Sequence, residues 1–130
     1  MKNVTWYGQG SLRIISAGKC IYIDPLWIVE EMHDADIILI THTHFDHLSE
    51  EDIKKVIKED TVFAAPQDCV DQLKEEFDHE MIVVLPGEEL DIKGVHIRVV
   101  AAYNVVKTQN HPKENNWVGY VVDTDEGKYY

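Results

Sequence analysis

Short apolar runs separated by turn residues divide the first quarter of the chain into strands. Residues 4–7 and 11–15 contain alternating polar and apolar positions on either side of the glycine-containing segment 8–10, a pattern that predicts a β-hairpin. A third strand is predicted over residues 20–23, and it ends before Pro25 because proline has no N–H to donate to a strand ladder. Three strands in succession are therefore expected before any helix.

The middle of the chain shows signals for both strands and helices. The run 37–40 is short, apolar and mostly β-branched, which predicts a buried strand. Residues 26–35 before it are irregular or form a short helix. Further on, Ile53, Val56 and Ile57 recur at helical spacing, which predicts an amphipathic helix of about three turns.

A second strand and helix pair follows in the same order. The apolar run 61–65 predicts a buried strand that ends at Pro66. After the proline, Val70, Leu73 and Phe77 form one apolar stripe of a second helix, with acidic residues on the opposite face. This alternation of strand and helix is typical of a sheet that contains parallel strands.

The last part of the chain returns to strands. Residues 81–85 predict a strand, and residues 88–91 and 95–101 predict a hairpin around the turn 93–94. Residues 117–122 predict a further strand. Together these patterns predict an α/β (α+β) architecture in which a pair of mixed sheets carries helices on the outside.

The composition is that of one globular domain. The 130 residues are 45% hydrophobic and 28% charged, and we expect a single domain over residues 1–130. No apolar stretch approaches membrane-spanning length, the start is not a secretory signal, and Cys20 and Cys69 form no recognisable framework. These features predict a cytoplasmic protein with inert thiols and no membrane partner. The net charge of −12 argues against a nucleic acid as partner, because phosphates would be repelled.

The most specific feature is a cluster of ligand-type side chains directly after the run 37–40: His42, His44, Asp46 and His47. In an extended segment, residues two apart point to the same side, so His42 and His44 can converge on one ion. Asp46 and His47 follow the bend and more naturally address a second position nearby. Imidazoles with a carboxylate suit zinc, and also iron, manganese or nickel. Solvated loop histidines are the alternative interpretation, but this spacing favours a metal site.

The segment 42–47, His-Thr-His-Phe-Asp-His, resembles the signature of the metallo-β-lactamase superfamily. Residues 1–24 resemble the opening strands of that superfamily. Residues 102–104 (Ala-Tyr-Asn), 111–113 (His-Pro-Lys) and 117–121 (Trp-Val-Gly-Tyr-Val) resemble its ascorbate-6-phosphate-lactonase-like branch of metal-dependent hydrolases. The resemblance implies the N-terminal portion of an αββα sandwich.

The resemblance also implies roles for particular residues. His111 corresponds to the third ligand of the first metal, beside His42 and His44. Asp46 and His47 correspond to ligands of the second metal, with Asp46 as the catalytic carboxylate. Without the resemblance, a His-Pro pair in a polar loop is commonly just exposed.

Asp24 has two interpretations, which the sequence leaves evenly balanced. In the family it lies behind the metal ligands, where a carboxylate orients a ligand histidine through its other ring nitrogen. Alternatively, it is a strand-end aspartate that caps the turn at Pro25.

The chain departs from the family pattern in two ways. Gln9 stands where relatives often carry a histidine, so no ligand is predicted there. In addition, the family continues with a Gly-Asp-Thr segment whose aspartate bridges both metals, and later with a final histidine, whereas this sequence ends at Tyr130. We therefore expect an incomplete domain with one firm metal site and a second site that is weak or empty.

The function implied by the resemblance is metal-dependent hydrolysis. A Zn²⁺ ion, or alternatively Mn²⁺ or Fe²⁺, would carry a hydroxide that attacks a lactone, ester or phosphoester of a small-molecule substrate. The alternative is a metal-binding but inactive fragment or subunit that needs another chain, or a second copy of itself, to complete the site.

Overall fold

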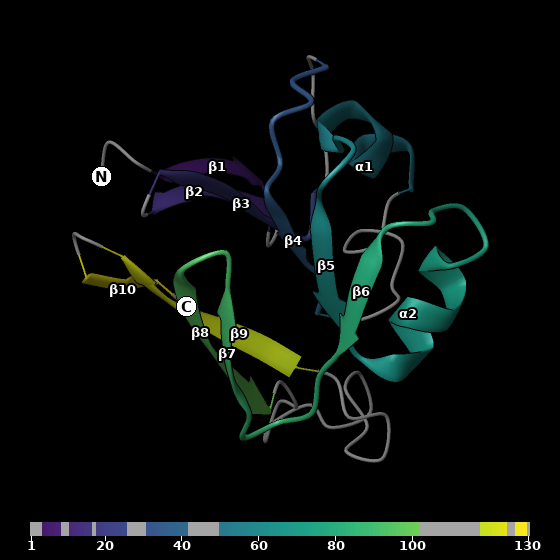
Figure 1. Ribbon diagram of the computed structural model, residues 1–130. Coiled ribbons are helices and arrows are strands. Elements are labelled where there is room, and N and C mark those ends of the chain that lie inside the picture. Colours follow the sequence, from purple (N-terminus) through teal and green to yellow (C-terminus); the bar gives the residue numbers. More distant parts are fainter. Residues whose placement is uncertain are drawn as a thin grey trace.

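The computed structural model describes residues 4–8, 11–16, 18–25, 31–41, 50–101, 118–124 and 127–129. Their strands form a six-stranded sheet and a four-stranded sheet, which pack face to face (Figure 1). Helices cover the outer face of the six-stranded sheet (Figure 1). The predicted combination of mixed sheets and outer helices is confirmed for these residues.

The six-stranded sheet has the order β1-β2-β3-β4-β5-β6. Its strands are β1 (Val4–Gly8), β2 (Ser11–Ser16), β3 (Lys19–Ile23), β4 (Ile37–Leu39), β5 (Val62–Ala65) and β6 (Glu80–Val83). The first three strands pair antiparallel, as the predicted hairpin requires, and the pairs from β3 to β6 are parallel. The carboxyl ends of β3, β4, β5 and β6 therefore lie along one edge of this sheet.

The four-stranded sheet is antiparallel and has the order β10-β9-β8-β7. Its strands are β7 (Glu89–Ile92), β8 (Val95–Ala101), β9 (Val118–Thr124) and β10 (Gly127–Tyr129). The turn between β7 and β8 has positive φ at Lys93 (52°) and at Gly94 (88°). Two consecutive positive φ values match the twist of a tight hairpin, so the turn predicted at 93–94 is confirmed.

The helices α1 (Glu50–Val56) and α2 (Gln67–Leu73) pack on the outer face of the six-stranded sheet. The predicted burial of Val70, Leu73 and Phe77 is confirmed, but α2 ends at Leu73, so Phe77 lies after the turn that follows the helix instead of on it. Neither helix has the length and apolar character needed to cross a membrane.

The first helix is shorter than predicted. It has seven residues, roughly two turns instead of three. Thr61 accounts for its end: the hydroxyl accepts a hydrogen bond from the Lys58 N–H (2.9 Å) and donates one to the Ala35 carbonyl oxygen (2.7 Å). These bonds turn the chain toward β5 soon after Val56, and apolar spacing alone does not reveal them.

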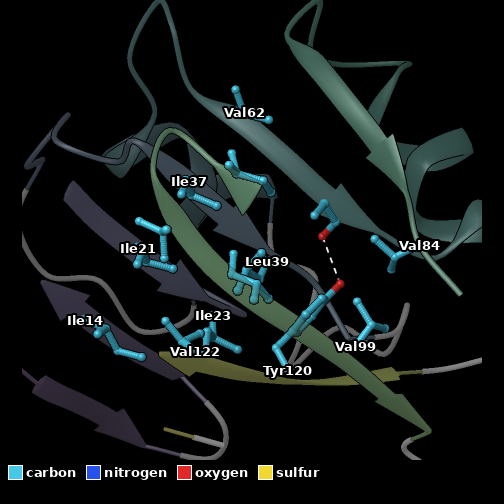
Figure 2. Close-up of a cluster of buried hydrophobic side chains, with 14 of the residues drawn as sticks. Ile14, Ile21, Ile23, Ile37, Leu39, Val62, Val84, Val99, Tyr120 and Val122 are labelled. Atoms are coloured by element: carbon cyan, nitrogen blue, oxygen red, sulfur yellow. Dashed lines mark hydrogen bonds between the residues drawn. The ribbon is translucent and has the colours of Figure 1, made fainter. Parts of the chain in front are cut away.

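Strands β4 and β5 are buried on both faces. Ile37, Leu39, Val62 and Ala64 contribute to the core between the two sheets (Figure 2), which also contains Tyr120 from β9. The residues between them contribute to the core beneath the helices. Burial on both faces explains why these strands read as continuous apolar runs in the sequence.

Both cysteines are buried and unpaired. Burial, reinforced by the negative charge of Asp34, raises the pKa of Cys20 to about 12, and burial raises the pKa of Cys69 above the usual thiol range. We expect both thiols to resist iodoacetamide at pH 8 in the native protein and to react once guanidinium exposes them, because the thiolate is the reactive form. Counting the added groups by mass spectrometry measures this, and rapid labelling of the native chain would contradict it.

Candidate metal centre

The residues Ile40 and Thr41, here called the β4 tip, continue β4 at the carboxyl edge of the parallel strands. His42 follows them directly in the sequence. Open α/β sheets place their binding sites outside the carboxyl ends of parallel strands. The β4 tip is therefore the element that delivers the predicted ligand cluster, and three sets of hydrogen bonds hold it.

On the side of β3, the side chain of Asp24 holds the β4 tip. The Asp24 N–H donates to the Leu39 carbonyl oxygen at 2.8 Å, as the last bond of the parallel ladder. Asp24 then has a positive φ of 47°, a conformation that aspartate tolerates better than most residues, and Pro25 follows. Its buried carboxylate accepts hydrogen bonds from the Thr41 N–H (2.8 Å) and the Thr41 hydroxyl (2.7 Å). The carboxylate thus takes the place of the backbone carbonyl that would continue the ladder.

On the side of β5, Tyr120 holds the β4 tip. The Ile40 N–H donates to the Ala64 carbonyl oxygen at 3.0 Å. Continuation of a parallel ladder would bring the N–H of residue 66 to the Ile40 carbonyl, but Pro66 has none. The Tyr120 hydroxyl lies 2.7 Å from the Ile40 carbonyl oxygen and 3.0 Å from that of Ala64, so its single hydrogen is shared between them. The dashed line at Tyr120 in Figure 2 marks the second of these bonds. A side chain from the other sheet supplies the donor that the proline lacks.

Tyr120 is almost completely buried at this position. Burial, reinforced by the negative charge of Asp24, raises the pKa of the phenol well above 10. The hydroxyl therefore stays protonated and remains a hydrogen-bond donor at physiological pH. In the sequence, Tyr120 stands out only through the family resemblance of residues 117–121. Its position in an alternating strand, between the inward-facing Val118 and Val122, predicts that Tyr120 also faces the core. A buried phenol needs a hydrogen-bond partner, so this position could have indicated a polar contact in the core.

The third bond joins the two stretches of chain that carry the predicted ligands. The Val118 N–H donates to the Thr41 carbonyl oxygen at 3.2 Å. Thr41 directly precedes His42, and Val118 directly follows the segment 102–117, which contains His111. The flanks of both ligand-bearing segments therefore meet at one edge of the sandwich.

Most of the predicted site residues lie outside the described part of the chain. These are His42, His44, Asp46 and His47, within residues 42–49, and His111, within residues 102–117. Asp24 is described, and its bonds to Thr41 place its carboxylate beside the start of the ligand cluster. Its orientation of a ligand histidine stays a prediction, and so does the convergence of His111 with His42 and His44.

The donor set fits a transition metal. Among the residues that the structure describes, no group of three His, Cys, Asp or Glu side chains could hold a metal ion. The predicted ligands are the imidazoles of His42, His44, His47 and His111 and the Asp46 carboxylate, a combination that suits zinc, manganese or iron.

Comparisons with a family model, with related sequences and with solved structures all match this chain to the same group of proteins. Residues 3–130 match the family model described as Beta-lactamase superfamily domain. A UPF0173 metal-dependent hydrolase from Ruegeria pomeroyi is 30% identical over 111 residues, which cover 76% of this chain and 47% of that protein. The structure of a candidate metal-dependent hydrolase from Parabacteroides distasonis has a TM-score of 0.78 at 27% identity, covering 96% of this chain and 57% of that one. The chain thus spans about half the length of the relatives that it matches.

A more distant structural neighbour shares the fold. CmlA, a diiron β-hydroxylase from Streptomyces venezuelae, has a TM-score of 0.64 at 14% identity and is matched over 96% of this chain and 28% of its own. At this identity the similarity concerns the arrangement of helices and strands alone.

Proposed function

The chain belongs to the beta-lactamase superfamily, and from this membership we propose that it carries the first metal-binding segment of a metal-dependent hydrolase. The resemblance seen in residues 42–47 is confirmed at the level of the family, and the predicted fold class is confirmed as well. The observation that best supports the proposal is that hydrogen bonds hold the β4 tip directly before His42. Three side-chain and backbone contacts fix the residues just before His42, and one of them comes from the residue that follows the His111 segment.

The proposed ligands of the firm site are His42, His44 and His111. This arrangement of three histidines leaves a fourth coordination position open, which is typical of catalytic zinc sites. Asp46 and His47 would contribute to a second site, which we propose is weak or empty in this chain. The Asp46 carboxylate is the proposed general base, accepting a proton from the attacking water.

We propose zinc as the resident metal, with Mn²⁺ or Fe²⁺ as alternatives. A bound divalent cation would act as a Lewis acid that activates water and stabilises the charge developing on the substrate oxygen. The substrate is proposed to be a small molecule with a lactone, ester or phosphoester bond. The net charge of −12 does not exclude an anionic substrate, because a bound cation reverses the local potential.

Metal content and hydrolysis measured on the same preparation test this proposal. For protein purified without chelator, we expect about one zinc per chain by element analysis, as for a single three-ligand site. Zinc or manganese should stimulate the hydrolysis of a nitrophenyl ester, a simple lactone or a nitrophenyl phosphodiester, and EDTA should abolish it.

The outcomes of this experiment separate the alternatives. A chain that binds no zinc contradicts the proposed metal site. Zinc bound without hydrolysis of any of the three substrates favours the alternative from the sequence, a metal-binding chain that needs another polypeptide. Two tightly bound ions per chain would contradict the prediction that the second site is weak.

A further inference from the structure

Both strands beside β4 stop at a proline at the level of the β4 tip. Pro25 follows the end of β3 and Pro66 follows β5, and the backbone ladders beside β4 end with the bonds Asp24 N–H to Leu39 and Ile40 N–H to Ala64. No backbone donor from β5 then reaches the Ile40 carbonyl, and the Thr41 N–H bonds to a side chain. Side chains replace the missing backbone partners on both sides. Asp24 directly follows the neighbouring strand β3, whereas the Tyr120 hydroxyl comes from the other sheet, 80 residues from Ile40 in the chain.

We propose that Tyr120 is a positioning residue for the metal centre, acting with the Val118 N–H to fix the two carbonyl groups from which the chain continues to His42. This inference rests on the proposed function. It assigns to Tyr120 a role in ligand geometry, in addition to its contribution to the core between the sheets.

The placement of the two bonds supports this role. The acceptors are the carbonyl oxygens of Ile40 (2.7 Å to the Tyr120 hydroxyl) and Thr41 (3.2 Å to the Val118 N–H). These carbonyls belong to the last two peptide planes before His42, so their orientation sets the position from which the ligand segment starts. Binding sites tolerate displacements of their ligating groups of only about 0.5 Å before affinity falls.

The same strand, β9, carries both contacts to the β4 tip. Val118 and Tyr120 both face inward on β9, which begins directly after the segment that contains His111. Docking β9 against the β4 tip therefore sets the distance between Thr41, which precedes the segment with His42 and His44, and Val118, which follows the segment with His111. The hydroxyl is the only polar atom of the Tyr120 side chain, so its removal tests this contact with little change in volume.

The test compares Tyr120→Phe with Tyr22→Phe. Tyr22 is equally buried, and its hydroxyl donates to the Asp34 carboxylate (2.8 Å), which precedes the amino end of β4, away from the tip. Each variant loses one buried hydroxyl, so we expect both to unfold at lower urea concentration without metal. Only Tyr120→Phe should bind Zn²⁺ about 10- to 100-fold more weakly, the range found when outer partners of metal ligands are removed. Only this variant should change the visible absorption of bound Co²⁺, which reports ligand geometry.

A rescue variant provides a second, independent measurement. Replacing Pro66 with alanine restores an N–H at the ladder position opposite the Ile40 carbonyl. In the Tyr120→Phe background, Pro66→Ala should therefore recover part of the lost Zn²⁺ affinity. If Tyr120→Phe alone does not fold, the effect of removing the hydroxyl is measured in the Pro66→Ala background instead. A weaker Zn²⁺ affinity in the double variant than in Pro66→Ala supports the proposal, and equal affinities contradict it.

Two results would overturn the inference. The first is a Zn²⁺ affinity and a Co²⁺ spectrum of Tyr120→Phe equal to those of Tyr22→Phe while the wild type binds metal; this result leaves the proposed function intact. The second is a wild-type chain that binds neither ion, which removes the proposed function and this inference together.

Discussion

Zinc affinity is expected to fall by more than about 100-fold when His42 or His44 is replaced with alanine, because removing a ligand costs more than the 10- to 100-fold lost with an outer partner. Both residues belong to the proposed three-histidine site, and Thr41, which directly precedes His42, is held by the Asp24 carboxylate. Competition with a chromophoric chelator measures the affinity directly. The same loss is expected for His111→Ala if the two segments converge.

His96→Ala is the matched control for the ligand variants. His96 lies on β8, where its ring nitrogens contact the carboxylates of Glu89 (3.1 Å) and Asp91 (3.3 Å), away from the β4 tip. Its replacement removes an imidazole without touching the proposed site and should leave zinc binding unchanged. Equal affinities for His42→Ala, His44→Ala and His96→Ala would show that the cluster does not hold the ion.

Asp24→Ala is expected to weaken both the fold and the metal site. The variant removes two hydrogen bonds to a buried carboxylate and leaves the Thr41 N–H and hydroxyl without these acceptors. Hydrogen bonds to charged groups contribute about 1.5–3 kcal/mol each and are not fully additive, so the free energy of unfolding should fall by about 2–4 kcal/mol. Zinc affinity should fall about 10- to 100-fold, because the residues before His42 lose their support on one side.

Two further variants separate the contributions at this position. Asn at position 24 tolerates the positive φ and can still accept one bond from Thr41, so Asp24→Asn should have an intermediate effect. Thr41→Val removes only the hydroxyl bond and should destabilise the chain by about 1 kcal/mol. Urea unfolding in EDTA measures the free energy of unfolding of each variant, and zinc titration measures its zinc affinity. An Asp24→Ala chain with wild-type stability and affinity would show that the carboxylate supports neither.

The elements that depend on local patterns were predictable from the sequence. Pro25 and Pro66 mark the ends of β3 and β5 because proline cannot donate to a ladder, and the apolar runs between them became the central strands. The stripe of Val70, Leu73 and Phe77 became the buried face of the second helix and the turn after it. The length of the first helix was predicted wrongly, because it depends on bonds that join Thr61 to Ala35 and Lys58.

The hydrogen bonds that hold the β4 tip beside the candidate site were harder to predict, because they join segments that are distant in the sequence. The ligand cluster itself is contiguous, so its spacing could be read directly. The partner of Asp24 is a threonine 17 residues away, on a neighbouring strand. Tyr120 reaches β4 from the other sheet, and nothing near it in the sequence indicates which backbone group it satisfies. A single sequence shows that a buried phenol needs an acceptor, but the acceptor is defined only by the packing of the two sheets.

The bond between Tyr120 and Ile40 also bears on when the site forms during folding. Its partners are 80 residues apart, and contacts of such long sequence separation form slowly, because a long loop must close first. A ribosome that has released residues 42–47 has therefore produced the ligand motif well before β9 exists to hold the strand that presents it. The proposed metal site would accordingly reach its native geometry late in the folding of this polypeptide, after the second sheet has docked.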